Sequence, residues 1–335
     1  MTDWRDDLDP RSRGALQRSR MPKWTQPMLA TLTDARFSSP DWIFERKLDG
    51  ERCLVFRRKS RLHLLSRNRQ QLNDTYPELI EALAGQPAEH YIVDGEIVAF
   101  DGNTTSFSRL QGRIGIHTPE QAGASGIKVY LYLFDVLYLD HYDTTGLPLR
   151  ARKQLLRRRF DFSDPLRFTL HRNADGEQLF RDACRKGWEG LIAKRADSPY
   201  QRSRSRHWLK FKCVNRQELV IGGYTDPKGS RGGFGALLLG YYEDDALRYA
   251  GKVGIGFDKD TLQQLGDRLA ALTRKTCPYA ETPPDAGSSL HWVTPKLVAE
   301  IGFTEWTDDR RLRHPRFLGL RRDKPARKVV REEPQ

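Results

Sequence analysis

The longest apolar stretch of the sequence constrains its fold most. In KVYLYLFDVLYLD (128–140), aromatic residues, valines and leucines follow one another, and only Asp135 and Asp140 interrupt them. This composition and length predict a central strand of a sheet. A membrane-spanning helix needs about 20 apolar residues in succession, so we do not expect a membrane protein. The first twenty residues have no apolar segment of the kind that secretion signals carry, so secretion is not supported.

Shorter segments with the composition of strands and helices surround this run. Strands are predicted at 42–47, 52–58, 61–67, 91–100, 189–195 and 207–212, and helices at 76–85, 150–160 and 175–187. This mixture predicts an α+β domain of antiparallel sheets with helices over residues 21–216. Residues 1–20 mix Asp and Arg with few apolar residues, and we expect a flexible leader there.

The C-terminal third has a different pattern. Three predicted strands at 218–225, 235–244 and 247–254 precede one amphipathic helix at 261–272, and 291–307 supplies further strand material. Several short strands with one inserted helix fit a small β-barrel such as the OB-fold. We therefore expect an OB-fold domain over 217–328 and a tail over 329–335, and a chain of 335 residues is long enough for both domains.

The charge of the chain indicates its kind of partner. Lys and Arg number 57 against 44 Asp and Glu, which leaves a formal net charge of +13. Such an excess indicates a polyanion, most plausibly nucleic acid. Charge alone does not distinguish an enzyme from a binding protein.

The four cysteines stand far apart in the sequence. Cys53, Cys184, Cys213 and Cys277 form no CxxC pair, which argues against a zinc ribbon and against a disulfide scaffold. We expect reduced thiols in a cytosolic protein.

The sharpest local feature is KLDGER (47–52), directly after the apolar residues of a predicted strand. A lysine at a strand end, followed by a tight Asp-Gly turn, presents its amine at the floor of a pocket. The amine becomes a nucleophile only when positive charge or desolvation lowers its pKa. An exposed lysine beside an ordinary turn would have the same sequence, so this motif alone leaves both interpretations open.

Further motifs, in a fixed order, remove this ambiguity. They are KxDGxR at 47–52, SRN at 66–68, DGE at 94–96, Phe-Asp at 134–135, EGxxxK at 189–194, KxK at 210–212 and RxDK at 321–324. In this order they resemble the signature motifs of the covalent nucleotidyltransferases, which comprise DNA ligases, RNA ligases and mRNA capping enzymes. The resemblance covers most of the chain. It implies a nucleotidyltransferase (adenylation) domain followed by an OB-fold β-barrel.

The resemblance implies a role for each matching residue in nucleotide chemistry. Lys47 would attack the α-phosphorus of ATP and hold AMP covalently. Lys210 and Lys212, two apart on a predicted strand, point to one face and could offset phosphate charge and help keep Lys47 unprotonated. The other residues implied to bind ATP are Glu45 at the adenine amino group, Arg52 and Glu96 at the ribose, Phe134 stacked on adenine, and Lys194 of the EGxxxK element.

Two further groups follow from the resemblance. Glu96 and Glu189 would hold Mg²⁺ or Mn²⁺, since hard oxygen ligands suit a metal that serves phosphoryl transfer. Arg321 and Lys324, with Asp323 supporting them, would contact the ATP tail after the second domain moves over the nucleotide. Taken without the resemblance, RRDKPARKVVR (321–331) also fits a plain basic tail.

A basic stretch predicts the DNA contact. Residues 194–216 hold eight Lys or Arg and one acid, Asp197, and Arg202, Arg204 and Arg206 fit a loop laid against phosphates. Arg67 of the SRN element is implied by the resemblance to bind the 5′-phosphate of a nick.

Within the superfamily, the segments 27–37, 66–79 and 314–333 most resemble the ATP-dependent ligase module of the bacterial end-joining ligases, known as ligase D and ligase C. This implies nicked or broken double-stranded DNA as substrate, a Ku-type end-binding partner, a monomer, and a place in the bacterial cytoplasm at the nucleoid. NAD⁺ is not expected, because the tetra-cysteine zinc site of NAD-dependent ligases has no counterpart here.

Two alternatives remain at this stage. The first is an RNA ligase or a GTP-using capping-type nucleotidyltransferase of the same superfamily. The second is a non-catalytic DNA-binding protein on the same fold, against which the complete set of Lys47, Glu96, Glu189, Lys210 and Lys212 argues.

Overall fold

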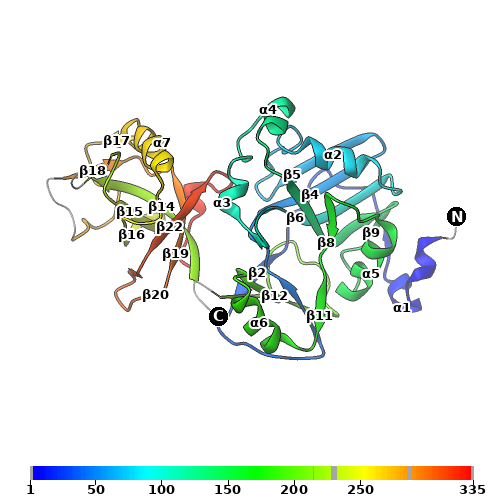
Figure 1. Ribbon diagram of the computed structural model, residues 1–335. Helices are drawn as coiled ribbons and strands as arrows, with labels where there is room; N and C mark the ends of the chain where they lie inside the picture. Colours follow the sequence, from blue (N-terminus) through cyan, green and yellow to red (C-terminus); the bar gives the residue numbers. More distant parts are fainter. Residues whose placement is uncertain (1–2, 214, 228–231, 285–288, 333–335) are drawn as a thin grey trace. The chain divides into compact units, whose positions relative to one another are not determined.

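The structure is a computed structural model that describes residues 3–213, 215–227, 232–284 and 289–332 (Figure 1). The chain divides into two compact units, Met1–Cys213 and Val214–Glu333. The division lies close to the boundary expected after residue 216. Each unit is described by itself below. No helix among the described residues is long and apolar enough to cross a membrane.

The first unit contains an eight-stranded sheet in the order β1-β9-β8-β6-β4-β5, with β10 beside β8 and β7 beside β6. Its strands are β1 (Gln17–Arg18), β4 (Glu51–Arg58), β5 (Arg61–Ser66), β6 (His90–Asp101), β7 (Thr104–Thr105), β8 (Val129–Leu139), β9 (Tyr142–Asp143) and β10 (Leu166–Phe168). The long apolar run at 128–140 thus forms β8, between β6 and β9, as expected for a central strand.

Helices cover one face of this sheet. Alternate residues such as Val55, Val93 and Leu133 pack there with Leu79 of α2 (Pro77–Ala84) and Leu155 of α5 (Leu149–Arg159). The shorter helices α3 (Phe107–Leu110) and α4 (Pro119–Ala124) follow β7 in the chain.

A second sheet of five strands completes the first unit. Its order is β11-β3-β12-β13-β2, with β2 (Leu29–Leu32), β3 (Trp42–Arg46), β11 (His171–Asn173), β12 (Gly190–Arg195) and β13 (Arg204–Lys212). Phe44, Leu191 and Phe211 lie on one face and pack against Leu179 and Ala183 of α6 (Gly176–Arg185). Because side chains alternate along a strand, the neighbouring residues of β3, β12 and β13 lie on the opposite face.

A third apolar cluster joins the two sheets. Leu54 and Phe134 come from the eight-stranded sheet, Trp208 comes from β13, and Met28 and Tyr200 come from flanking segments. The uncovered faces of the two sheets therefore meet at this cluster, and the candidate site lies there.

The N-terminal segment differs from the flexible leader that we expected. Residues Trp4–Asp7 form a short 3-10 helix and Pro10–Gly14 form α1. Trp4 and Leu8 are buried in the main core of the first unit, and Asp7 pairs with Arg158 and Arg159 of α5. The few apolar residues of this segment suffice to anchor it, because the complementary surface is supplied by α5, about 150 residues later in the chain.

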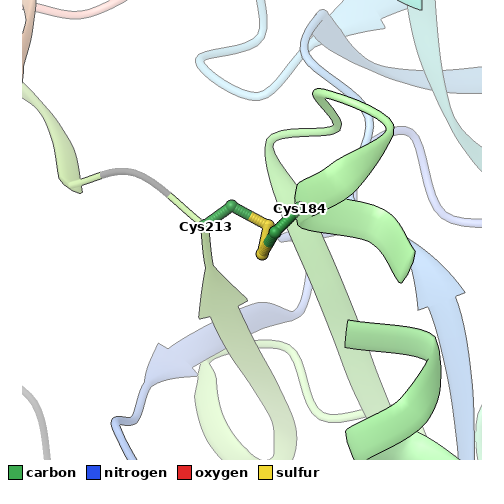
Figure 2. The surroundings of a disulfide bond; sticks show 2 residues. All are labelled: Cys184 and Cys213. Carbon is green, nitrogen blue, oxygen red and sulfur yellow. A yellow bond between two sulfur atoms is a disulfide. The ribbon is translucent and has the colours of Figure 1, made fainter. Parts of the chain in front are cut away.

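The cysteines also differ from expectation. Cys184 of α6 and Cys213 form a disulfide (Figure 2) across a sequence separation of 29 residues. Packing of α6 against β13, seen in the edge-to-face contact of Phe180 and Phe211, brings the two together. Cys53 and Cys277 are free. The expectation of four reduced thiols is therefore wrong for Cys184 and Cys213.

The second unit contains a seven-stranded antiparallel sheet, a separate pair of short strands and a twelve-residue helix, as expected for an OB-fold. Its elements are β14 (Asn215–Thr225), β15 (Leu237–Glu243), β16 (Ala246–Val253), α7 (Lys259–Ala270), β17 (Thr273–Arg274), β18 (Leu290–Val293), β19 (Val298–Phe303), β20 (Glu305–Trp306), β21 (Leu312–Arg313), β22 (Arg316–Arg321) and the 3-10 helix Ala326–Lys328. Strand β14 pairs with β15, β18 and β19. Val329, at the start of the expected tail, is buried in this core, and residues 333–335 lie outside the described part.

Candidate active site

Lys47 stands directly after β3, where a tight turn leads into β4. Its backbone N–H donates to the carbonyl of Gly190 at 2.9 Å, so the residue is still held against β12. The turn needs a glycine at position 50, because a Cβ atom there would lie 2.1 Å from the carbonyl oxygen of Ile97. The motif therefore positions its lysine through backbone contacts on two sides.

The register of the five-stranded sheet sets Lys210 and Lys212 near Lys47. Lys212 lies opposite Gly190 on β12. The carbonyl of Gly190 also accepts the hydrogen bond from the backbone N–H of Lys47. Lys210 lies opposite Ile192, and Ile192 lies opposite Glu45 on β3. Residues opposite one another share a face of a sheet. The two lysines of the KxK motif thus share a face with Glu45, as the period of two predicted.

The amine of Lys47 contacts a carboxylate. Its Nζ atom donates to Glu189 Oε2 at 2.6 Å. Burial lowers the pKa of Lys47, but the nearby carboxylates of Glu189, Asp49 and Glu96 outweigh burial, and the net pKa is raised. From the sequence, Lys210 and Lys212 are expected to help keep this amine unprotonated. In the structure the carboxylates dominate, because Glu189 is in direct contact with the ammonium group.

Arg52 is held by a buried network. Its Nε and Nη2 atoms donate to the two oxygens of Asp94 at 2.5 and 2.6 Å. The hydroxyl of Tyr200 donates to Asp94 Oδ2 at 2.6 Å and accepts from the N–H of Met28 at 2.8 Å. Bidentate pairing of this kind fixes the plane of a guanidinium group. The direction of Arg52 is therefore determined by Asp94 and Tyr200.

Glu45 is buried between two lysines. Lys153 Nζ lies 2.5 Å from Glu45 Oε1 and Lys194 Nζ lies 2.6 Å from Glu45 Oε2. Burial raises the pKa of Glu45, but the two ammonium groups outweigh it and the net pKa is lowered. Burial lowers the pKa of Lys194 to about 8, against the opposing effect of Glu45. The carboxylate is thus a fixed, charged hydrogen-bond acceptor.

Phe134 adjoins this cluster. Its ring centroid lies 4.1 Å from Lys194 Nζ and 4.7 Å from the guanidinium carbon of Arg52, and the ring packs edge-to-face on Trp208. The structure therefore brings Phe134 together with both Arg52 and Lys194, side chains that the sequence analysis assigned to the same nucleotide.

The chemistry of the carboxylates fits a divalent metal ion bound with few protein ligands. Glu189 contacts the Lys47 amine directly, and the charges of both Glu189 and Glu96 raise the pKa of that lysine. Among the described residues, no group of three or more His, Cys, Asp or Glu is placed to hold a metal. Mg²⁺ commonly uses one or two carboxylates together with phosphate and water, which these two side chains could provide.

The residues of the RxDK motif lie in the second unit. Arg321 ends β22 and donates to Asp323 through Nε and Nη2 and to Glu300 through Nη1, at 2.7–2.9 Å. Lys324 Nζ donates to Glu218 Oε2 at 3.1 Å. All of these pairs form within the second unit, so the motif has a defined conformation there.

The basic residues assigned to DNA are exposed. Arg67 lies in the turn after β5, and Arg202 precedes β13 and pairs with Asp143 at 3.0 Å. Arg204 and Arg206 lie on β13, on either side of buried Ser205. Their exposure is compatible with contact to a large polyanion.

Lys153 and Tyr200 were not predicted from the sequence, and Asp94 was placed in the DGE motif without a role of its own. Lys153 carried a detectable signal, because it lies on the buried face of a helix at the spacing that Leu149 and Leu156 define. A charged residue at such a position indicates a buried partner. No local signal distinguished Tyr200, whose role depends on a carboxylate 106 residues away.

The fold and the site together define a nucleotidyltransferase of the ligase type, with an adenylation domain and an OB-fold domain. The family of the ATP-dependent DNA ligase domain matches residues 27–212, and that of the ATP-dependent DNA ligase C-terminal region matches residues 230–324. The chain belongs to the ATP-dependent DNA ligase family. The comparison thus favours a DNA ligase over an RNA ligase, a capping-type enzyme or a non-catalytic binding protein.

Individual proteins agree with this assignment. The multifunctional non-homologous end joining protein LigD of Pseudomonas aeruginosa is 39% identical over 322 residues, which cover 94% of this chain and 37% of that protein. The LigD of Mycobacterium tuberculosis H37Rv is 38% identical over 91% of this chain and 40% of its own length. The chain thus spans about two fifths of these relatives. The structure of a mycobacterial DNA ligase D complexed with ATP and MES superposes with a TM-score of 0.66 at 36% identity, covering 92% of this chain and 98% of that one.

Proposed function

We propose that this protein seals breaks between a 5′-phosphate and a 3′-OH in double-stranded DNA through a covalent AMP on Lys47. The observation that carries the proposal is the position of Lys47, held against β12 by its backbone and in contact with Glu189. The amine would attack the α-phosphorus of ATP, pyrophosphate would leave, and a proton would be lost from nitrogen. AMP would then pass to the 5′-phosphate, and attack by the 3′-OH would release it.

The nucleotide would bind between the two sheets of the first unit. Glu45 and Lys194 would face the base, and Phe134 would stack on it. Arg52 and Glu96 would bind the ribose, while Lys210 and Lys212 would offset the charge of the α-phosphate. The ion pairs and ring contacts that already connect Glu45, Lys194, Phe134 and Arg52 support a single binding region.

We further propose that Glu96 and Glu189 hold Mg²⁺ or Mn²⁺. When bound, the metal would supply charge stabilisation at the phosphates. Glu189 already binds a cation, the ammonium group of Lys47, which supports its suitability for a positively charged partner.

The second unit would act in the first step only. Arg321 and Lys324 would be carried to the pyrophosphate end of ATP by movement of this unit, and Asp323 would orient Arg321. The bidentate contact from Arg321 to Asp323 supports the orienting role.

The DNA would contact the exposed arginines of the first unit. Arg67 would bind the 5′-phosphate at the break, and Arg202, Arg204 and Arg206 would bind backbone phosphates. By similarity to LigD, we propose a role in bacterial non-homologous end joining, in the cytoplasm at the nucleoid, as a monomer that works with a Ku-type end-binding protein.

Mass measurement and labelling test the covalent step. Incubation with ATP and Mg²⁺ should add the mass of one AMP, and pyrophosphate should remove it. The Lys47→Ala variant should neither take up label from ATP nor seal nicked DNA. Label acquired from GTP but not from ATP, or nick sealing by Lys47→Ala, would contradict the proposed function.

A further inference from the structure

Lys153 belongs to none of the motifs that identified the nucleotide site. It lies on α5, is only 2% exposed, and directs its ammonium group at Glu45 Oε1, 2.5 Å away. The same group donates to the carbonyl of Thr169 at 3.0 Å. The lysine is thus bound to one carboxylate oxygen and anchored to the backbone beside it.

The Glu45 carboxylate retains capacity for a further donor. A carboxylate can accept about four hydrogen bonds, and Lys153 and Lys194 each occupy one oxygen. An isolated buried carboxylate would tend to take up a proton. The two ammonium groups oppose this, so Glu45 offers acceptors only.

The position of Glu45 connects it with the nucleophile. Glu45 lies on β3, two residues before Lys47, and its partner Lys194 lies 4.1 Å from the Phe134 ring.

Polar atoms without partners lie close to Glu45. His171 lies opposite Glu45 on β11. Burial, followed by the positive charge of Lys153, lowers the pKa of His171 to about 4, so its ring is neutral. Among the described residues, buried Thr169 Oγ1 and His171 Nδ1 have no hydrogen-bond partner. Polar atoms without partners, beside a charged acceptor, indicate a polar ligand.

The two purine bases differ where such an acceptor would meet them. Adenine presents an amino donor at position 6, whereas guanine presents an oxygen acceptor there. A fixed carboxylate would therefore bind adenine and repel guanine. If Glu45 could move or become protonated, it could donate a hydrogen bond to guanine and the discrimination would weaken.

We propose that Lys153 is a positioning residue that sets the preference for ATP over GTP by holding the Glu45 carboxylate as a hydrogen-bond acceptor. This inference rests on the proposed function, in which the base binds beside Glu45. Lys194 shares the contact with Glu45, but it also touches Phe134 and Trp208. Lys153, by contrast, contacts Glu45, the carbonyl of Thr169 and the ring of Phe168. Of these three, Glu45 is the one assigned to ATP, so we expect the effect of Lys153 on the nucleotide to pass through Glu45.

The Lys153→Met variant tests the proposal, because methionine keeps the approximate length of the side chain and removes its charge. The rates of covalent labelling are measured with radiolabelled ATP and GTP for the wild type and the variant. The ratio of kcat/KM for ATP to that for GTP should fall by about tenfold or more, the loss expected when a buried charged group loses a hydrogen-bonded partner. Most of the fall should come from a higher KM for ATP, and Lys153→Arg should restore part of the ratio.

A double-mutant cycle with Glu45→Gln separates positioning from general destabilisation. If Lys153 acts through Glu45, Lys153→Met should change the ATP:GTP ratio little when Glu45 is already glutamine. This variant pair also leaves no buried carboxylate unpaired, so it remains informative where Lys153→Met alone folds poorly. The Arg152→Met variant is the matched control, since Arg152 is the neighbouring buried cation on α5 and pairs with Asp135; it should lower stability and leave the ratio unchanged.

The outcomes distinguish this inference from the proposed function. An unchanged ATP:GTP ratio in folded Lys153→Met, with ATP labelling intact in the wild type, would overturn the inference alone. An equal change of the ratio in Arg152→Met would also overturn it. Absence of any covalent label on the wild type would overturn the proposed function and the inference with it.

Discussion

Glu189 Oε2 lies 2.6 Å from Lys47 Nζ, although the two residues are 142 positions apart in the sequence. Glu189 directly precedes Gly190, which has a φ of +152° and leaves no room for a Cβ atom, because that atom would lie 1.8 Å from the carbonyl oxygen of Phe211. The path of the backbone at Gly190 therefore sets the distance between this carboxylate and the amine.

Replacing Glu189 by glutamine should impair the first chemical step. The variant keeps the size of the side chain but loses the charge that pairs with Lys47 and that would bind the metal. We expect the rate of covalent labelling with ATP to fall by about 10- to 100-fold and the Mg²⁺ concentration for half-maximal labelling to rise. The control is Glu177→Gln on α6, whose carboxylate accepts a hydrogen bond from the hydroxyl of Ser38 at 3.0 Å. Unaltered labelling and metal dependence in Glu189→Gln would argue against this role.

Replacing Tyr200 by phenylalanine should weaken ATP binding more than turnover. The variant removes the hydroxyl that bonds Asp94 and so loosens the carboxylate that orients Arg52. We expect KM for ATP to rise by about five- to tenfold with little change in kcat, consistent with loss of one hydrogen bond to a charged group. Tyr76→Phe is a suitable control, because its hydroxyl also bonds a buried carboxylate, that of Glu51, at 2.7 Å. A rise in KM of the same size in both variants would show that general destabilisation is the cause.

Reduction of the Cys184–Cys213 disulfide should destabilise the first unit. A cross-link over a separation of 29 residues is expected to contribute about 3–4 kcal/mol to the free energy of unfolding in the chain-entropy model. Unfolding in denaturant, followed with and without a dithiol reductant, should reveal a loss of up to this size. The double variant Cys184→Ser/Cys213→Ser should not respond to the reductant, whereas Cys277→Ser should respond like the wild type. A wild type that is equally stable with and without reductant would refute the prediction.

The stability of the second unit should depend on pH through Glu218. Burial raises the pKa of this carboxyl, but Lys324 and Arg321 outweigh burial and lower it to about 2. In the unfolded chain, a glutamate has a pKa of about 4.3. The stabilisation of the folded state by the charged Glu218 is therefore complete above that pH and is lost as the pH falls toward 2. Between pH 5 and 3, the wild type should therefore lose more stability than Glu218→Gln, by about 1–3 kcal/mol.

Thermal unfolding of both proteins at several pH values measures this difference. Glu281→Gln serves as the control in the same unit, because Glu281 is 88% exposed and pairs only loosely with Arg248, at 3.4 Å. Its pH profile should match that of the wild type. Parallel profiles for the wild type and Glu218→Gln would contradict the assignment.

Much of the architecture was accessible from local sequence. The predicted strands at 42–47, 52–58 and 128–140 correspond to β3, β4 and β8 within one or two residues. The alternation that placed Lys210 and Lys212 on one face also holds, with buried Phe211 between them. These features are encoded by residues close in the chain, because backbone preference and the period of side-chain burial are local properties.

The sequence by itself determined the order of the elements and the motifs that identify a ligase, since both depend on neighbouring residues. Only the tertiary structure decided which distant side chains complete them. Lys153 reaches Glu45 across 108 positions, Trp4 joins a core built mostly from later strands, and two separated cysteines meet where α6 packs on its sheet. Such pairs depend on strand register and on the packing of helices against sheets, which bring together residues that carry no information about each other in the local sequence.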